Sequence, residues 1–150
     1  MKKLASVVLL SVCLFSLCSC AFLGLTPSKK SLKERASKHL GLSLENTTVL
    51  EEWDTHGGFH GDGETFVKLS CADGFEENLH FWKRGPLRGE AYRYYYEWGG
   101  LFEHPETGEK VIPEAKNGWY WYFKGTGAMN WDFALYDCDE NILYYYEFDA

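Results

Sequence analysis

A glycine-rich stretch at residues 54–64 constrains this chain more than any other feature of its sequence. It holds four glycines within seven positions, between two apolar, β-prone segments at 47–53 and 65–71. Glycines at that density make a continuing helix or a regular strand costly, and they let the backbone adopt positive φ or pass close to itself. In the second segment, successive residues fall alternately on a mostly apolar face and on an opposite face, which is typical of a strand. We therefore expect two antiparallel strands with the glycine-rich stretch at their tip.

Two roles are open to this stretch, because it also carries two histidines and three carboxylates. In the first role it is a hydrogen-bonded turn, in which Asp54 and Asp62 accept backbone N–H bonds, the glycines adopt positive φ and Phe59 folds back on the sheet. In the second role it binds a divalent metal ion, since imidazole with carboxylate suits zinc or another transition ion. The candidate ligands are His56, His60, Asp54, Asp62 and Glu64. A phosphate site is excluded, because the stretch has no lysine and its carboxylates would repel an anion.

A helix is predicted upstream of the first strand. Ser31 and Glu34 have the spacing of a capping box, and Leu32, Ala36 and Leu40 recur every four residues. The residue that follows this stripe is a glycine, which suits the end of a helix. The helix would therefore present one narrow apolar face to the rest of the domain.

Downstream of residue 74 the sequence predicts a short second helix and further strands. The helix is expected over 75–83, where large apolar residues share one side before a Gly-Pro pair stops it. Strands are expected at 91–98, 118–124, 131–136 and 142–148, and the Asp- and Asn-rich linker between the last two predicts a C-terminal hairpin. The expected fold class is α+β: an N-terminal helix packed on an antiparallel sheet of about five strands, as a single domain over residues 31–150.

Aromatic residues crowd two of these predicted strands and lie on both faces of the run 118–124. They would either fill a core on a second, covered face of the sheet or offer a platform for a sugar. The platform residues would be Trp119, Trp121, Tyr94 and Tyr96.

Two cysteines, Cys71 and Cys138, lie in the predicted domain. They could form one disulfide in an exported protein, or stay as two buried thiols, because spacing alone does not show that they meet. Cys71 could serve as a thiol nucleophile, but a cysteine at the end of a strand usually packs. We assign no catalytic residue.

The N-terminus predicts export and lipidation. Residues 1–19 have a positive start and an uncharged apolar run of about fourteen residues, which suits a secretory signal peptide and is short for a membrane span. The run ends in LCSCA at residues 17–21, which resembles the bacterial lipobox. In such signals the cysteine is acylated and cleavage occurs just before it, so the resemblance gives this role to Cys20. Two acyl chains would anchor the protein stably, with residues 20–30 as a lipidated tether on the extracytoplasmic face.

The charge of the chain argues against one class of partner. From residue 39 onward there are 21 acidic and 8 basic residues. This excess of negative charge disfavours binding to nucleic acid and other polyanions, whereas it suits the binding of cations and promotes solubility.

Two motifs carry a resemblance to a bacterial family. The segment DTHGGFHGDG at residues 54–63 and the segment WDFALYDCDENILYYYEFD at 131–149 are similar to a family of small uncharacterised proteins of gut and soil bacteria. The Asn-Gly-aromatic run that begins at Asn117 fits the same family. The resemblance implies a single domain from the first strand to the C-terminus, and it brings no activity with it.

These features together favour a membrane-anchored bacterial lipoprotein whose small extracytoplasmic domain binds or interacts and does not catalyse. Its partners would be the membrane, through the lipid on Cys20, and an unknown protein or cell-envelope component, and it would need no cofactor. The first alternative is a metal-binding protein or metal-dependent enzyme centred on residues 54–64. The second is a carbohydrate or cell-wall binder that uses exposed aromatic side chains.

Overall fold

The computed structural model describes residues 31–57, 62–89, 92–93, 95, 102–125 and 130–149. A single compact unit spans Ser31–Ala150. The predicted signal peptide and tether, with Cys20, lie outside the described residues. Within the described part of the chain, no helix combines the length and the apolar character needed to cross a membrane.

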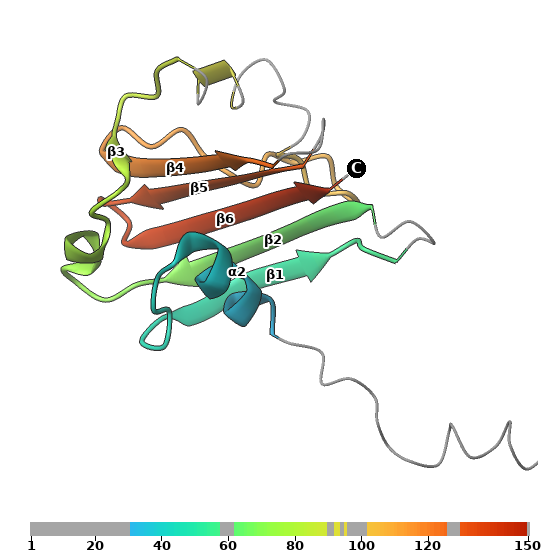
Figure 1. Cartoon of the computed structure of the whole chain (residues 1–150), viewed down its shortest axis with the longest axis horizontal. Coiled ribbons are helices and arrows are strands. Elements are labelled where there is room, and N and C mark those ends of the chain that lie inside the picture. The colour runs from blue at the N-terminus through green and yellow to red at the C-terminus, as the bar shows by residue number, and fades with distance from the viewer. Residues whose placement is uncertain are drawn as a thin grey trace, which may run out of the picture. The chain divides into compact units, whose positions relative to one another are not determined.

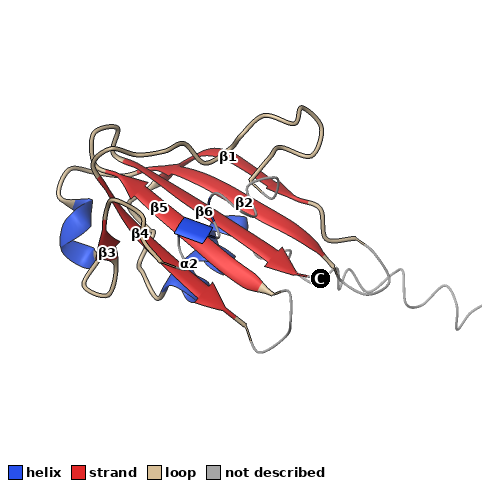
Figure 2. Ribbon diagram, turned by 90° about the horizontal axis from the view of Figure 1, so that it is seen from above, coloured by secondary structure: helices blue, strands red, loops and turns tan. Residues whose placement is uncertain are grey.

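Six antiparallel strands form one twisted sheet (Figures 1 and 2). Their bounds are β1 Thr48–Asp54, β2 Gly63–Ser70, β3 Lys83–Arg84, β4 Gly118–Lys124, β5 Trp131–Asp137 and β6 Ile142–Asp149. Across the sheet they lie in the order β1-β2-β6-β5-β4-β3. The predicted α+β class is confirmed in its coarse form, but the sheet has six strands rather than about five, and the described structure is mostly β.

Helix α2 (Leu32–Leu40) packs on one face of this sheet (Figure 1). The N–H of Glu34 donates to Ser31 Oγ at 3.2 Å, as the capping-box spacing predicts. At the other end Gly41 adopts a left-handed conformation with φ of 63°, and its N–H bonds to the carbonyl of Ser37. Ala36 and Leu40, two of the three residues of the predicted stripe, are buried.

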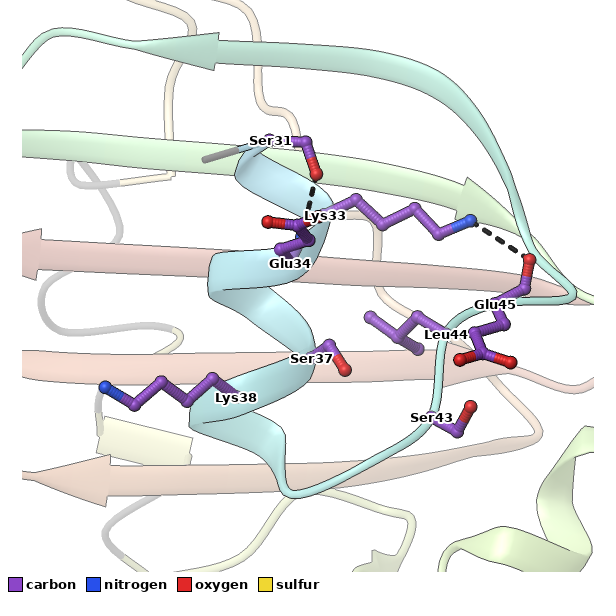
Figure 3. Close-up of a pocket in the computed structure, with 8 residues that line it drawn as sticks. All are labelled: Ser31, Lys33, Glu34, Ser37, Lys38, Ser43, Leu44 and Glu45. Carbon is purple, nitrogen blue, oxygen red and sulfur yellow. Dashed lines mark hydrogen bonds between the residues drawn. The ribbon is translucent and has the colours of Figure 1, made fainter. Parts of the chain in front are cut away.

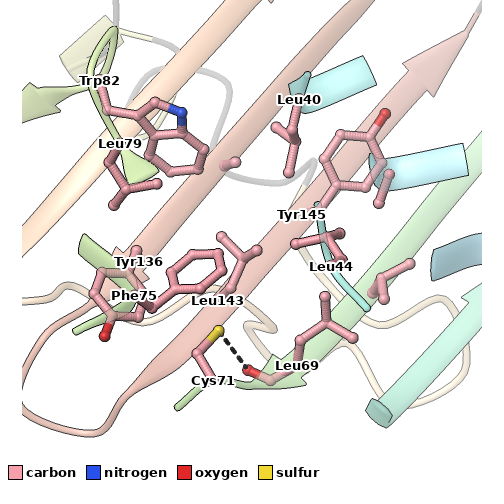
Figure 4. Close-up of a cluster of buried hydrophobic side chains, with 13 residues drawn as sticks. Leu40, Leu44, Leu69, Cys71, Phe75, Leu79, Trp82, Tyr136, Leu143 and Tyr145 are labelled. Carbon is pink, nitrogen blue, oxygen red and sulfur yellow. Dashed lines mark hydrogen bonds between the residues drawn. The ribbon is translucent and has the colours of Figure 1, made fainter. Parts of the chain in front are cut away.

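Each face of the sheet carries a core. The helix-side core joins α2 and the segment that follows β2 to alternate positions of β2, β5 and β6 (Figure 4). Its buried members are Ala36, Leu40, Leu44, Val67, Leu69, Cys71, Phe75, Leu79, Trp82, Ala134, Tyr136, Leu143 and Tyr145. On the other face, Tyr95, Phe102 and Ile112 come from the long connection between β3 and β4 and are almost fully buried. That connection therefore supplies a second cover, and most of the aromatic side chains on this face fill a core.

Both predicted hairpins are present. β1 pairs with β2, so that Asp54 lies opposite Thr65 beside the glycine-rich stretch. β5 pairs with β6 along its whole length. In the turn between them Asp137 Oδ1 accepts the N–H of Asp139 at 2.9 Å, and Asn141 takes a positive φ of 54°. This is the turn chemistry for which Asp and Asn are suited.

The chain between 75 and 98 departs from the prediction. The helix expected over 75–83 is only a 3₁₀ turn, Phe75–Asn78, because the chain then enters strand β3 and pairs with β4. The strand expected over 91–98 is wrong, since its described residues Tyr92, Arg93 and Tyr95 are helical. The helical turn directs Tyr95 inward, where its hydroxyl donates to the carbonyl of Ile112 at 3.0 Å, while Tyr92 is exposed.

Candidate functional site

A row of side chains crosses the helix-side face near one end of the sheet. Strand register places Phe123, Asp132, Glu147, Thr65 and Asp54 directly opposite one another, in that order, on β4, β5, β6, β2 and β1. Direct cross-strand neighbours on one face lie close together, so this row places Asp132 beside Glu147, with Asp54 two strands further along. Asp132 and Glu147 are only 8% and 3% exposed.

Helix α2 supplies the basic groups above this row. Arg35 and His39 are four residues apart, so both lie on the same side of the helix. Arg35 Nη2 donates to Glu147 Oε1 at 2.6 Å and lies 3.5 Å from Asp149 Oδ2. This contact ties the first turn of α2 to the end of β6.

His39 lies at the centre of a second set of contacts. Its Nδ1 is 3.0 Å from Asp132 Oδ2, 3.0 Å from the hydroxyl of Tyr145 and 3.9 Å from Glu147 Oε1. The Tyr145 hydroxyl also donates to Glu147 Oε2 at 3.2 Å. Among the described residues, His39, Asp132 and Glu147 form a trio whose ligand atoms all lie within 4.8 Å of one another.

The glycine-rich stretch contributes His56 to the same end of the sheet. The backbone N–H of His56 donates to Asp54 Oδ1 at 3.0 Å, and its ring Nδ1 is 2.6 Å from the same oxygen. Its Nε2 is buried and lies 3.4 Å from Asp149 Oδ2. The predicted role of Asp54 as an acceptor of a backbone N–H is therefore confirmed.

A close approach explains one glycine of the stretch. A Cβ built on Gly63 would lie 2.7 Å from the backbone nitrogen of His56 and 2.8 Å from its Cα. Neither Gly57 nor Gly63 has a positive φ, so that expectation is wrong for these two residues. Gly63 is needed because no side chain fits against His56.

The structure separates the other ligands proposed from sequence. Asp62 is exposed, and Glu64 lies on the opposite face of β2 from Thr65, because successive side chains of a strand alternate. His60 and Phe59 lie outside the described residues. Asp54 and His56 are therefore the two of this set that the structure brings into contact.

The residues proposed as an aromatic platform are also divided. Trp119 and Trp121 are half-buried on the helix-side face, and the guanidinium of Arg84 lies 5.8 Å from the centre of the Trp119 ring. Tyr94 and Tyr96 lie outside the described residues. Further along β4, Trp121 and Phe123 are stacked with an interplanar angle of 12°. Phe123 is 54% exposed, so the more open ring of this stacked pair is one that the sequence did not single out.

Both cysteines are free thiols, and the disulfide considered from sequence is absent between Cys71 and Cys138. Burial raises the pKa of Cys71 to about 11. At neutral pH this thiol is protonated, which disfavours a role as a nucleophile.

Burial and charge shape the protonation of the site. Burial raises the pKa of Asp132, and the nearby carboxylates of Glu147 and Asp149 add to this, against the opposing effect of His39. Burial alone would also raise the pKa of Asp54, but the two hydrogen bonds from His56 and the charges of His56 and Arg35 lower it overall. The pKa of Tyr145 is raised by burial and then by the charges of Asp132 and Glu147, so its hydroxyl stays a donor.

A pocket of about 300 Å³ opens beside these groups. Its walls include Asp132, Glu147, Asp149, His39, Phe123 and Trp131. We call it the acidic pocket. It gives solvent and ligands access to one imidazole and three carboxylates beside an exposed aromatic ring.

A larger hollow of about 700 Å³ lies between α2 and the segment that follows it (Figure 3). It is lined mostly by exposed serine, lysine and glutamate side chains. Lys33 Nζ bonds there to the carbonyl oxygens of Glu45 and Thr47, at 3.3 and 2.6 Å. These contacts join α2 to the start of β1, and none of the residues that line this hollow belongs to the trio of metal-ligating side chains found among the described residues.

Sequence reasoning missed Arg35, His39, Asp132, Tyr145 and Glu147. One signal was available: Asp132 and Glu147 occupy the same alternate positions as Ala134 and Tyr145, which face the helix-side core. A charged residue at an inward position of a strand requires a partner.

Comparison of the chain with protein-family models, with curated proteins and with solved structures finds no match.

Proposed function

We propose that this chain is a bacterial lipoprotein, anchored on the extracytoplasmic face of a membrane through Cys20, whose domain binds a ligand and does not catalyse a reaction. The lipobox-like sequence at residues 17–21 supports the anchor. The acidic pocket carries the binding role, because it joins buried carboxylates to an accessible hollow beside an exposed ring. Pockets that bind small molecules combine apolar walls with a few convergent polar groups in this way.

The anchor is tested by labelling growing cells with a radioactive fatty acid. The parent chain and a Cys18→Ser variant should incorporate the label, whereas Cys20→Ser should not. Cys18→Ser is the matched control, because it removes a neighbouring cysteine and leaves the proposed acylation site in place. Label on Cys20→Ser, or its loss from both variants, contradicts the proposal.

A carbohydrate is a second candidate ligand, favoured by the stacked rings of Trp121 and Phe123. Flat, partly exposed aromatic faces suit the apolar faces of sugars, and the carboxylates of Asp132 and Glu147 lie one and two strands away across the sheet to accept bonds from hydroxyl groups. This candidate keeps Trp121 from the platform expected by sequence and adds Phe123 near the end of β4.

Calorimetric titration with cell-wall glycan fragments tests this candidate. Phe123→Ala should weaken binding at least about tenfold, an effect of the size that one lost aromatic contact produces. Phe81→Ala is the control, because Phe81 is 93% exposed and does not line the acidic pocket. Equal binding by both variants would exclude the platform.

A further inference from the structure

We infer that His39, Asp132 and Glu147 form a binding site for a divalent transition-metal ion of the zinc class. This inference names a ligand for the acidic pocket, and it rests on the binding role proposed for that pocket but not on the lipid anchor. The site differs from the metal site expected at residues 54–64, because it joins α2, β5 and β6 rather than the glycine-rich stretch.

The spacing of the ligand atoms fits such an ion. His39 Nδ1 lies 3.0 Å from Asp132 Oδ2 and 3.9 Å from Glu147 Oε1. A tetrahedral ion with bonds of about 2.1 Å holds its ligand atoms about 3.4 Å apart. The third pair of ligand atoms, on Asp132 and Glu147, lies within 4.8 Å. The separations within the trio therefore need to change by about 1.4 Å at most to surround an ion.

The balance of charge favours a bound cation. Among the residues that the structure describes, the ion-paired side chains at this end of the sheet include four carboxylates, Asp54, Asp132, Glu147 and Asp149, and one permanently charged base, Arg35. Even with both His39 and His56 protonated, the group keeps a net charge of minus one. Buried carboxylates require compensation, and a divalent ion at the Asp132 end would supply it where Arg35 does not reach.

Access and chemistry select the type of ion. The acidic pocket leaves one side of the trio open, so that water can complete the coordination, as in zinc sites with three protein ligands. An imidazole nitrogen with two carboxylates suits zinc and its neighbours, whereas calcium and magnesium prefer oxygen ligands alone. The Tyr145 hydroxyl donates to Glu147 Oε2 and would hold that carboxylate in position.

Arg35 and the ion would share Glu147. Arg35 Nη2 lies 2.6 Å from Glu147 Oε1, and Asp149 Oδ2 is a second acceptor 3.5 Å from the same nitrogen. Binding of an ion would move this guanidinium toward Asp149. That carboxylate therefore keeps the arginine paired when Glu147 turns to the metal.

The test uses the full chain in detergent, freed of metal by a chelator that is then removed. Titration with Zn²⁺ should show one ion per chain with a dissociation constant in the micromolar range or below. His39→Ala and Asp132→Asn should each weaken binding at least about 100-fold. His80→Ala is the matched control, because His80 is an exposed histidine outside the trio and should change the affinity less than twofold. Co²⁺ in place of Zn²⁺ should give visible d–d absorption that is lost in the same two variants.

The inference is overturned if no saturable binding of Zn²⁺ occurs, or if His39→Ala and His80→Ala bind alike. Circular dichroism checks the fold of each variant, and Asp132→Asn decides the result if His39→Ala does not fold. The other proposals fail independently, because fatty-acid labelling depends on Cys20 and glycan binding on Phe123. A negative zinc titration with normal labelling would leave the lipoprotein proposal intact and remove only the metal.

Discussion

Replacing Arg35 by methionine should destabilise the metal-free domain by about 2–4 kcal/mol, because it leaves a buried carboxylate without its base. The Glu147 side chain is only 4% exposed, and its Oε1 lies 2.6 Å from Arg35 Nη2. Two unit charges about 4 Å apart interact by about 4 kcal/mol at an effective dielectric constant of 20, and losing one partner of a buried pair costs about 3–5 kcal/mol. The expected cost is lower because the Arg35 side chain is 30% exposed and Tyr145 still donates to Glu147.

Urea unfolding at pH 7, followed by tryptophan fluorescence in the presence of chelator, measures this cost. The set comprises Arg35→Met, Glu147→Gln and the double variant, with Lys38→Met as the control for loss of an exposed charge on the same helix. Lys38→Met should change the free energy of unfolding by less than about 0.5 kcal/mol. The double variant should cost about 1.5–3 kcal/mol less than the sum of the two single variants, which is the upper part of the range of about 0.5–3 kcal/mol for directly interacting residues. A cost below about 1 kcal/mol for Arg35→Met, or full additivity, would refute the view that this pair holds α2 to the sheet.

Four further predictions concern single residues of the site and core. Gly63→Ala should cost about 1–3 kcal/mol in urea unfolding, because its Cβ would overlap the backbone of His56; an unchanged midpoint would contradict the close approach. In the presence of chelator, Asp54→Asn should lower the free energy of unfolding at pH 7, because the pKa of the Asp54 carboxyl is lowered in the folded state. Such a carboxyl stabilises the fold at pH values above its ordinary pKa of 3.8, and this stability is lost as the pH falls through the folded-state pKa. Asp132→Asn should instead raise the melting temperature at pH 7, because the raised pKa of Asp132 means that its ionised form is costly in the folded state. This gain should vanish toward pH 4. A lower melting temperature for the variant at pH 7 would show that Asp132 is a structural ion-pair partner. A thiol reagent at pH 8 should leave Cys71 unmodified in the folded protein, as peptide mapping would show, because its pKa is about 11 and it is buried.

Local patterns predicted much of the fold. The helix N-cap at Ser31, the β-prone run at 118–124 and the Asp- and Asn-containing turn at 137–141 all depend on neighbours within a few residues, and each appears in the structure. The helical residues near Tyr95 were predicted as strand, because aromatic side chains favour strands unless tertiary contacts override that preference. Here the contact of the Tyr95 hydroxyl with the backbone of Ile112 and the burial of its ring require an inward turn of the chain.

The site could not be predicted in the same way. His39 and Asp132 are 93 residues apart in sequence and meet only because α2 packs on the face of the sheet that carries the Asp132 side chain. Residues 54–64 were predicted as a metal site because their histidines and carboxylates are close in sequence. Side chains alternate along β2, however, so Glu64 lies on the other face of the sheet. Proximity along the chain was therefore a poor guide to proximity in space, except for Asp54 and His56, which belong to one turn.

The position of β6 has a consequence for the order in which the domain can assemble. β6 lies between β2 and β5, so without residues 142–149 the sheet falls into two separate pieces, β1-β2 and β5-β4-β3. Neither piece can complete either core, because both cores take side chains from β6. The two pieces can therefore join into one domain only when β6 is available to pair with β2 and β5. In the export proposed above, this strand order would keep the domain open until β6 had also crossed the membrane.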